Sequence, residues 1–154
     1  MYSTHSTLGE KTLPPAYFSV RYEVLRAPLG KALGTERLKD DNDALHVWIT
    51  DEKDAVVSVG RAHTTDAEVA LVQIRMMATH SHHVGKGLGR QVLTALEKLA
   101  SQEMGARQGW LNARDNAVAF YARCGWATTN ERFVIDGIGP HTRMTRDFTI
   151  DPRT

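Results

Sequence analysis

Three glycines alternate with other residues just before a stretch with helical periodicity. The segment reads Val84, Gly85, Lys86, Gly87, Leu88, Gly89 and Arg90. Glycine lets backbone N–H groups approach an anion closely, and a helix N-terminus adds unpaired N–H donors and the positive end of the helix dipole. Lys86 and Arg90 supply further positive charge. The pattern predicts a cradle for a pyrophosphate group, with a glycine-rich turn that holds no ligand as the alternative.

Two common nucleotide-binding motifs do not fit this loop. The Walker motif places Ser or Thr after Gly-Lys, whereas Gly87 follows Lys86 here. The dinucleotide-binding motif G-x-G-x-x-G has a different glycine spacing. A nucleotide-binding protein that uses its glycine loop in another way stays open as an alternative.

The elements that position this loop are predicted from periodicity. A strand over 69–78 precedes it, and a helix from Leu88 to a stop at Gly105 follows, because apolar residues recur there with a period of 3.6. Two further strands are predicted over 45–50 and 55–63. Short turns link them to each other and to the strand over 69–78, so that the three form an antiparallel meander.

Helices and strands are also predicted on both sides of this central part. A helix begins at Pro14 and Pro15 and stops at Pro28, with a loop to residue 43. Further along lie a strand over 108–112, a helix capped by Asp115 or Asn116 and ended by Gly125, and strands near 126–129 and 142–148. The order predicts an α+β or α/β fold in which helices pack on a mixed sheet.

Composition excludes several classes of protein. A chain of 154 residues suits a single domain, expected over 1–154. The formal net charge of +1 gives no reason to expect a nucleic-acid partner, and the longest apolar runs are too short for a membrane span. Cys124 is the only cysteine, so no internal disulfide is possible. The N-terminus lacks a secretory-signal pattern, and a cytoplasmic location is expected.

The glycine loop resembles that of the GCN5-related N-acetyltransferase (GNAT) superfamily. The family motif is Gln/Arg-x-x-Gly-x-Gly/Ala at the start of a helix that follows a central strand. Gly87 and Gly89 match its two glycines, and Val84 stands where the family usually has Gln or Arg. Because such a cradle consists mainly of backbone N–H groups, this departure need not remove the function.

Two further stretches resemble the same family, so that the likeness covers about residues 14–148. Residues 74–78 are similar to its central strand, which carries a bulge and pairs with the pantetheine arm of coenzyme A. Residues 112–126 are similar to a later segment in which an Asn contacts the cofactor and a Tyr lies near its sulfur. Asn116 and Tyr121 match these positions, and Trp126 replaces a Phe. The likeness is greatest to a single-domain subgroup that also occurs fused to thioesterase-like domains, for which this chain is too short.

The resemblance implies an α/β sandwich-like α+β fold with a mostly antiparallel sheet, and acetyl-CoA as cosubstrate. It implies direct transfer of the acetyl group, in a ternary complex, to a primary amine of a small acceptor. Symmetry of oligomers in general makes a homodimer a reasonable expectation. The cofactor-binding residues implied are Met76, Met77, Ala78, Val84, Gly85, Lys86, Gly87, Leu88, Gly89, Arg90, Asn116 and Tyr121.

Acetyl transfer requires a polarised carbonyl, a neutral amine and a protonated leaving thiolate. Tyr121 is the candidate general acid, because a phenol is protonated at neutral pH; packing alone is the alternative. By resemblance, the backbone N–H of Met77 or Ala78 polarises the carbonyl. The general base stays open among His63, His141, Glu131 and a chain of waters, since imidazole titrates near neutrality.

Other polar residues have weaker functional interpretations. Selection of the acceptor could involve charged residues of the first helix and its loop, or Arg75, which needs a partner within an otherwise apolar strand; the candidates are Arg21, Arg26, Glu36, Arg37 and Arg75. His80, His82 and His83 lie close together without a cysteine or an evident fourth ligand, so no metal is expected. Cys124 at a helix end is interpreted as packing. A non-catalytic acyl-CoA binding module is the main alternative function, favoured by Val84 and opposed by Tyr121.

Overall fold

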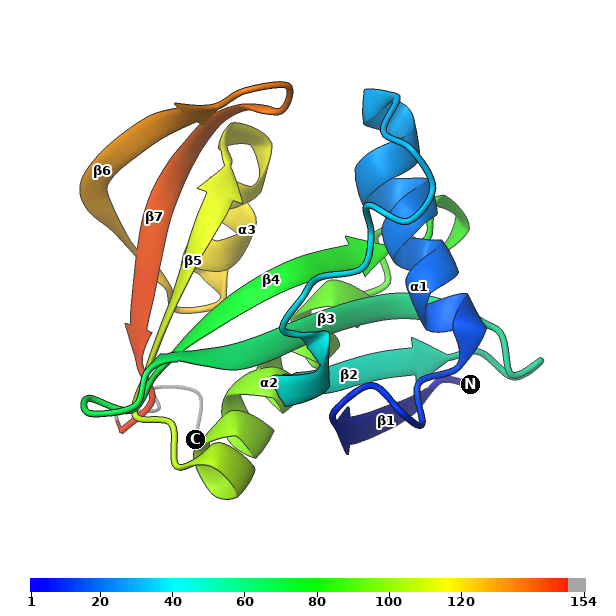
Figure 1. Cartoon of the computed structure of the whole chain (residues 1–154), viewed down its shortest axis with the longest axis horizontal. Coiled ribbons are helices and arrows are strands. Elements are labelled where there is room, and N and C mark those ends of the chain that lie inside the picture. The colour runs from blue at the N-terminus through cyan, green and yellow to red at the C-terminus, as the bar shows by residue number, and fades with distance from the viewer. Residues whose placement is uncertain (150–154) are drawn as a thin grey trace.

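A seven-stranded sheet is the centre of this computed structural model, in which residues 1–149 are described (Figure 1). The strand order is β1-β2-β3-β4-β5-β7-β6. All neighbours are antiparallel except β4 and β5. The strands are β1 (Ser3–Leu8), β2 (Leu45–Thr50), β3 (Val56–Asp66), β4 (Leu71–Thr79), β5 (Gln108–Arg114), β6 (Ala127–Ile135) and β7 (Gly139–Asp147).

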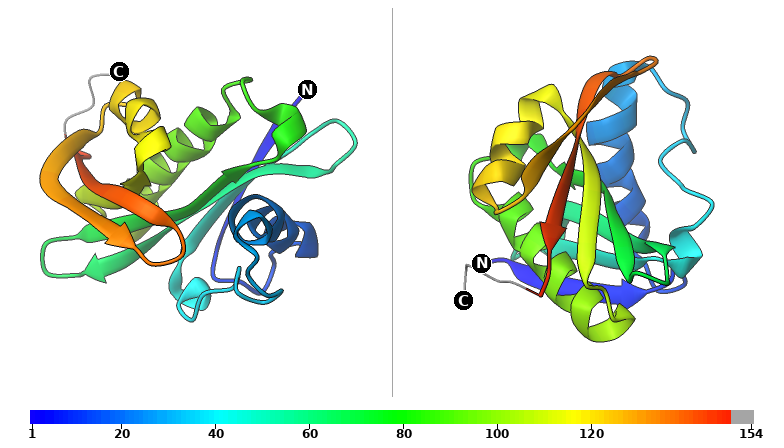
Figure 2. Two further views of the ribbon diagram at one scale, coloured as in Figure 1. Left: turned by 90° about the horizontal axis from the view of Figure 1, so that it is seen from above. Right: turned by 90° about the vertical axis from the view of Figure 1, so that its left-hand side faces the viewer.

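Helices cover both faces of this sheet (Figure 2). Helix α1 (Pro15–Arg21) lies on one face and continues as a π-helical turn, Tyr22–Arg26, and a 3-10 turn, Ala27–Leu29. The other face carries α2 (Leu88–Met104) and α3 (Val118–Arg123). Short 3-10 turns are formed by Asp41–Asp43, Ser81–His83 and Asp115–Ala117.

The core lies between the sheet and the two larger helices. The apolar stripe of α2 packs fully buried against β2 and β3, because its period of 3.6 turns one face toward the sheet. Tyr17, Phe18 and Val20 of α1 form a second cluster on the opposite face, with Val59 and Ala78. Burial of one such large side chain contributes about 1.5–3 kcal/mol, so the two clusters fix α1 and α2 on opposite sides of β3.

The sequence predicted most of these elements. The β2-β3-β4 meander and the helix that begins at Leu88 and ends before Gly105 are confirmed, as is the α+β fold with a mostly antiparallel sheet. The prediction that Asp115 or Asn116 caps the next helix was wrong, because Ala117 is the N-cap of α3 and makes no side-chain cap bond. Pro28 does not stop the first helix, since it lies within the 3-10 turn that continues the winding. Strand β1 was not predicted.

One domain over 1–154 stays a prediction, and residues 150–154 lie outside the described part. Within residues 1–149, no helix is long and apolar enough to cross a membrane.

The two parallel strands separate after a short paired stretch. Leu71–Gln73 of β4 pairs with Gln108–Trp110 of β5, and beyond these residues the strands diverge (Figure 1). Strand β4 also carries a bulge, since Met76 and Met77 together oppose the single residue Gly60 of β3. Met76 adopts φ +59°, a left-handed conformation that is costly for a residue other than glycine. The gap between β4 and β5 therefore opens beside an irregular, strained part of the sheet.

Candidate functional site

Two cavities lie beside the gap between β4 and β5. The larger cavity, of about 650 Å³, is enclosed by the end of β4, the glycine loop and α3. The smaller cavity, of about 280 Å³, is enclosed by β4, β5, the π-helical turn and the turn between β6 and β7. Met77, Ala117 and Tyr121 line both cavities. The two cavities are therefore neighbours that share these three residues in their walls.

The N-terminus of α2 faces the larger cavity. Gly85 and Gly87 adopt φ +85° and +77°, which favour glycine, and Gly87 caps the helix without a side-chain bond. Among residues 1–149, no atom comes within 4 Å of where a Cβ on either glycine would lie. The first-turn N–H groups of a helix have no intrahelical acceptor, so this open end suits an anion. Of the residues predicted for the cradle, Lys86 alone lies outside the lining, which includes Val84, Gly85, Gly87, Leu88, Gly89 and Arg90.

The bulge distributes β4 between the two cavities. Met76 lines the smaller cavity, Met77 lines both, and Ala78 lines the larger one. Strand β4 pairs with β5 only as far as Gln73. The edge of β4 that follows is therefore available to an extended ligand, which could bind as an added strand.

Tyr121 lies at the boundary of the two cavities with 9% of its surface exposed. Its carbonyl accepts a hydrogen bond from the N–H of Trp126 at 3.0 Å, and its ring makes edge contacts with Phe120 and Trp126. Burial, and then the nearby thiol of Cys124, raise the pKa of the hydroxyl well above its usual value. The phenol therefore stays protonated at neutral pH and can donate its proton.

His141 of β7 lines the smaller cavity, with 5% of its surface exposed. Its Nδ1 lies 2.8 Å from the carbonyl oxygen of Gly139. A carbonyl can only accept, so Nδ1 carries the proton and Nε2 of the neutral ring keeps a lone pair. The ring stacks on Phe133 with centroids 6.0 Å apart, which fixes its orientation. His141 can therefore accept a proton at Nε2.

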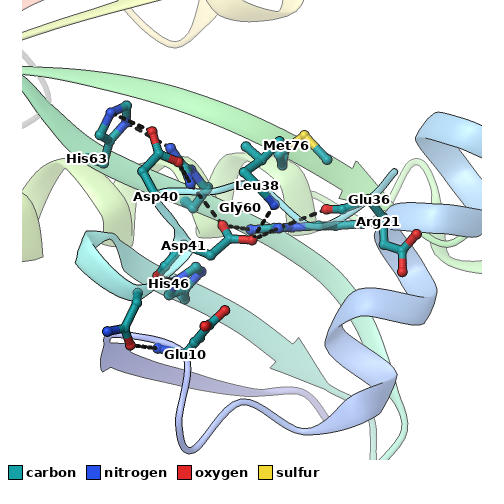
Figure 3. Close-up of polar contacts among 12 residues, drawn as sticks. Glu10, Arg21, Glu36, Leu38, Asp40, Asp41, His46, Gly60, His63 and Met76 are labelled. Atoms are coloured by element: carbon teal, nitrogen blue, oxygen red, sulfur yellow. Dashed lines mark hydrogen bonds and ion pairs between the residues drawn. The ribbon is translucent and has the colours of Figure 1, made fainter. Parts of the chain in front are cut away.

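His63 lies outside the lining of both cavities. Figure 3 shows it beside Asp40. Its Nδ1 accepts a hydrogen bond from Arg61 at 2.8 Å, and its Nε2 lies 2.9 Å from Oδ2 of Asp40. Burial and then the Arg61 charge lower the pKa of His63. Both ring nitrogens are thus engaged. Glu131, the third candidate base, pairs with Arg143 at 3.2 Å, also outside the cavities.

A buried charge network anchors α1 and the loop before β2 to the sheet (Figure 3). Asp41 bonds Arg21 at 2.9 Å and Arg61 at 2.8 Å, and all three side chains are fully buried. Burial opposes ionisation of Asp41, but the hydrogen bond and charge of Arg21, supported by Leu38 N–H and Arg61, lower its pKa to about 2. Arg21 is therefore a structural residue, whereas selection of the acceptor had been one of its predicted roles.

The other charged candidates lie in three environments: Arg37 is exposed, Glu36 is buried, and two arginines line the smaller cavity. Arg37 lies over the ring of Phe18 at 3.8 Å, and Glu36 accepts a hydrogen bond from the N–H of Gly34. Arg26 and Arg75 line the smaller cavity. Arg114 also lines the smaller cavity and was not among the predicted site residues. It lies at the end of β5, where the sheet register places it opposite His141 of β7.

The histidine-rich loop makes local contacts. His80 stacks on His82 with centroids 5.2 Å apart, and the hydroxyl of Tyr2 lies 2.9 Å from Nδ1 of His83. Within residues 1–149, no three or more His, Cys, Asp or Glu side chains are grouped so that they could hold a metal ion. Cys124 is buried at the end of α3.

Residues 19–148 match the family model described as acetyltransferase (GNAT) domain. The chain belongs to the GNAT family. Its relatives include the uncharacterized N-acetyltransferase YjcF of Bacillus subtilis (strain 168), which is 30% identical over 139 residues, 90% of this chain and 95% of that protein. The GNAT resemblance is therefore confirmed, whereas the likeness to the thioesterase-fused subgroup stays a prediction.

Solved structures show the same fold at low identity. An acyl-CoA N-acyltransferase from Pseudomonas aeruginosa has a TM-score of 0.79 at 20% identity, over 95% of this chain and 99% of that one. An aminoglycoside 6'-N-acetyltransferase complexed with coenzyme A has a TM-score of 0.75 at 12% identity, over 96% and 99%. These likenesses place the sheet and helices of this chain in the GNAT fold.

Proposed function

We propose that this GNAT domain transfers the acetyl group of acetyl-CoA directly to the primary amine of a small acceptor. The larger cavity takes acetyl-CoA, and the smaller cavity takes the acceptor. The observation that carries the proposal is that the two cavities adjoin and that Met77 and Tyr121 line both of them. Two reactants held in adjoining spaces react as if they were parts of one molecule, which removes much of the entropic cost of their encounter.

The residues around the larger cavity fit coenzyme A. The pyrophosphate binds at the open N-terminus of α2, beside Gly87 and Gly89. The pantetheine arm, which is extended and carries amide groups, pairs with the free edge of β4 beyond Gln73. Val84, which is 66% exposed, stands where the family usually has Gln or Arg. Because this departure changes only a side chain, the backbone donors of the cradle stay in place.

The reaction forms a C–N bond and breaks a C–S bond. The neutral amine attacks the thioester carbonyl carbon, and the carbonyl oxygen gains negative charge, which the N–H of Met77 or Ala78 stabilises. The nitrogen loses one proton to Nε2 of His141, directly or through a water. As the intermediate collapses, the coenzyme A thiolate leaves and takes the proton of the Tyr121 hydroxyl. The imidazolium of His141 then releases a proton and the Tyr121 oxygen takes one up through solvent, which restores both groups. The products are the acetylated amine and free coenzyme A.

His141 is the base that the geometry favours over His63. It lines the cavity assigned to the acceptor, and its Nε2 keeps a lone pair. Both nitrogens of His63 are occupied by Arg61 and Asp40. The cytoplasmic location and the homodimer stay predictions.

The proposal is tested by incubating the protein with acetyl-CoA and a panel of primary amines. Release of the coenzyme A thiol is measured with a colorimetric thiol reagent, and the gain of one acetyl group on the amine is measured by mass spectrometry. The expected result is thiol release that depends on both the amine and the protein, with one acetylated product. Acetyl-CoA binding without thiol release for any amine would favour a non-catalytic acyl-CoA binding module, the function that the departure at Val84 supports.

A further inference from the structure

The smaller cavity has a one-sided charge. Its lining contains three arginines, which come from three different elements: Arg26 from the π-helical turn, Arg75 from β4 and Arg114 from β5. His141 also lies there, together with the amides of Gln73 and Asn112. Among residues 1–149, neither Asp nor Glu contributes to this lining. The cavity is therefore a positive surface with additional hydrogen-bond donors.

These three half-buried arginines differ from five other arginines in how their charge is compensated, and the remaining arginines of the described chain are exposed. Arg21, Arg61, Arg132, Arg143 and Arg146 each form an ion pair with a carboxylate. Within the described chain, Arg26, Arg75 and Arg114 have no carboxylate within 4.0 Å. Arg26 donates to the carbonyl of Thr35 at 3.1 Å and approaches Sδ of Met76 at 3.8 Å.

The three charges also act on one another. Burial and then the charge of Arg114 lower the pKa of Arg26, and the charge of Glu36 opposes them. Burial and then the charge of Arg61 lower the pKa of Arg75; the charge of Asp40 opposes them, and Arg26 adds to the lowering. Half-buried like charges held close together are unfavourable unless an anion joins them.

We propose that the acceptor is an amine that also carries an anionic group, a carboxylate or a phosphate, which Arg26, Arg75 and Arg114 hold in the smaller cavity. This inference rests on the proposed function, because the same cavity is the one assigned to the acceptor. The planar guanidinium presents paired donors that match carboxylate and phosphate oxygens alike. The anionic end orients the molecule so that its amine faces His141 and Tyr121.

The same cavity disfavours a polycationic acceptor. Spermidine and similar polyamines would bring several positive charges next to three arginines, and like charges placed together cost several kcal/mol in an interface. A volume of about 280 Å³ suits a molecule of amino-acid size rather than an oligosaccharide. The coenzyme A phosphates do not account for these arginines, since the predicted pyrophosphate cradle lines the other cavity.

The first test measures anion binding without any reaction. Glutarate and inorganic phosphate are titrated separately, by calorimetry at constant ionic strength, into the full chain with and without coenzyme A. The variants are Arg75→Gln and Arg114→Gln, and the control is Arg132→Gln, an exposed arginine paired with Asp115. We expect one of the two anions to bind, with an affinity at least tenfold lower in both variants and unchanged in the control. Equal binding by wild type and both variants, or binding of neither anion, would overturn the proposal.

The second test measures which amines are acetylated. β-Alanine is compared with β-alaninamide, O-phosphoethanolamine with ethanolamine, and each with spermidine. We expect kcat/KM at least tenfold higher for the anionic member of at least one pair, and this preference should be lost in Arg75→Gln. The two pairs separate a carboxylate from a phosphate. Equal or better use of the uncharged member in both pairs, or better use of spermidine than of either anionic amine, contradicts the proposal.

The two tests separate failure of the inference from failure of the proposed function. Anion binding that depends on Arg75 and Arg114, with no thiol release, would refute the transferase activity and keep the anion site. Thiol release with uncharged or polycationic amines, together with no anion binding, would support the transferase activity and refute the anion site. Arg75→Lys, which keeps the charge, should retain more anion binding than Arg75→Gln if both variants fold, as measured by their melting temperatures.

Discussion

A Cβ atom on Gly60 would lie 2.5 Å from Sδ of Met77, so a side chain opposite the bulge of β4 would require its neighbours to move. The same atom would lie 2.8 Å from Cγ1 of Val92 and 3.0 Å from Cδ1 of Leu96, both in α2. Gly60 therefore lets β3 approach α2 while Met77 occupies the space between them. Met77 lines both cavities. The wall that the two cavities share therefore depends on the absence of a side chain at Gly60 in the neighbouring strand β3.

Replacement of Gly60 by alanine should both destabilise the fold and disturb the site. Overpacking of a filled core costs about 1–3 kcal/mol, and the new methyl group must displace Met77 or α2. We expect a lower free energy of unfolding in urea and weaker binding of acetyl-CoA. Gly89→Ala is the stability control, since its Cβ would meet Phe120 at an ordinary 3.4 Å and alanine favours a helix. A Gly60→Ala protein as stable as wild type would show that the close approach of β3 to Met77 and α2 does not limit the stability of the fold.

Removal of the Tyr121 hydroxyl should slow the chemical step and leave donor binding intact. The hydroxyl is the proton donor for the leaving thiolate in our proposal, and general acid catalysis contributes about 10²–10⁴-fold. We expect Tyr121→Phe to lower kcat within this range with little change in the Kd for acetyl-CoA, because the ring and its contacts remain. Steady-state kinetics and calorimetry measure the two quantities. An unchanged kcat would assign Tyr121 to packing alone.

Loss of the imidazole at position 141 should affect catalysis more than its loss at position 63. Nε2 of His141 keeps a lone pair within the smaller cavity, whereas the nitrogens of His63 are occupied by neighbours. We expect His141→Gln to lower kcat/KM about 10²-fold or more. His63→Gln should lower kcat/KM much less. The opposite ranking of the two variants would transfer the role of the base to His63.

Mild acid should destabilise the protein through His46. The fully buried imidazole lies 2.7 Å from both the Tyr17 hydroxyl and the carbonyl of Asp41. Burial lowers its pKa from 6.5 to about 4. The unfolded state therefore binds the proton first, and up to about 3 kcal/mol of stability is lost as pH falls from 6.5 to 4. The lowered pKa of Asp41 adds a further loss from about pH 3.8 to 2.

Urea unfolding at pH 7, 5.5 and 4.5 measures this effect. The free energy of unfolding should fall less between pH 7 and 4.5 in His46→Gln than in wild type. In His82→Gln, a change at an exposed position, it should fall as much as in wild type. Stability of the wild-type protein that does not change over this range would contradict the assignment.

Local patterns in the sequence were enough to predict the residues that line the larger cavity. The glycines of residues 85–89, the helix that follows them and Tyr121 are read from neighbouring residues, because helix periodicity and backbone freedom are local properties. Strand β1 was missed for the same reason. Its sequence, Ser-Thr-His-Ser-Thr-Leu, lacks apolar alternation, and it forms because its backbone pairs with β2 at the sheet edge.

Contacts between distant residues were beyond such patterns. Arg26 and Arg114 are 88 positions apart, and only the divergence of β4 from β5 brings them to one cavity. Asp41 meets Arg21 and Arg61, each 20 positions away, so the structural role of Arg21 could not be read from the helix alone. His63 has the residue type of a base, and its neighbours decide that both its nitrogens are engaged.

The binding of acetyl-CoA is the most direct test of the central claim. The melting temperature of the full chain is measured with acetyl-CoA, with ATP and with NAD, each up to millimolar concentration. A ligand that binds only the folded protein adds about 2.7 kcal/mol of stability at a hundred times its Kd. We expect a clear rise in melting temperature with acetyl-CoA and none with ATP or NAD. No rise with millimolar acetyl-CoA would contradict the proposed function and would mean that the cradle without a Gln or Arg at position 84 does not bind this cosubstrate.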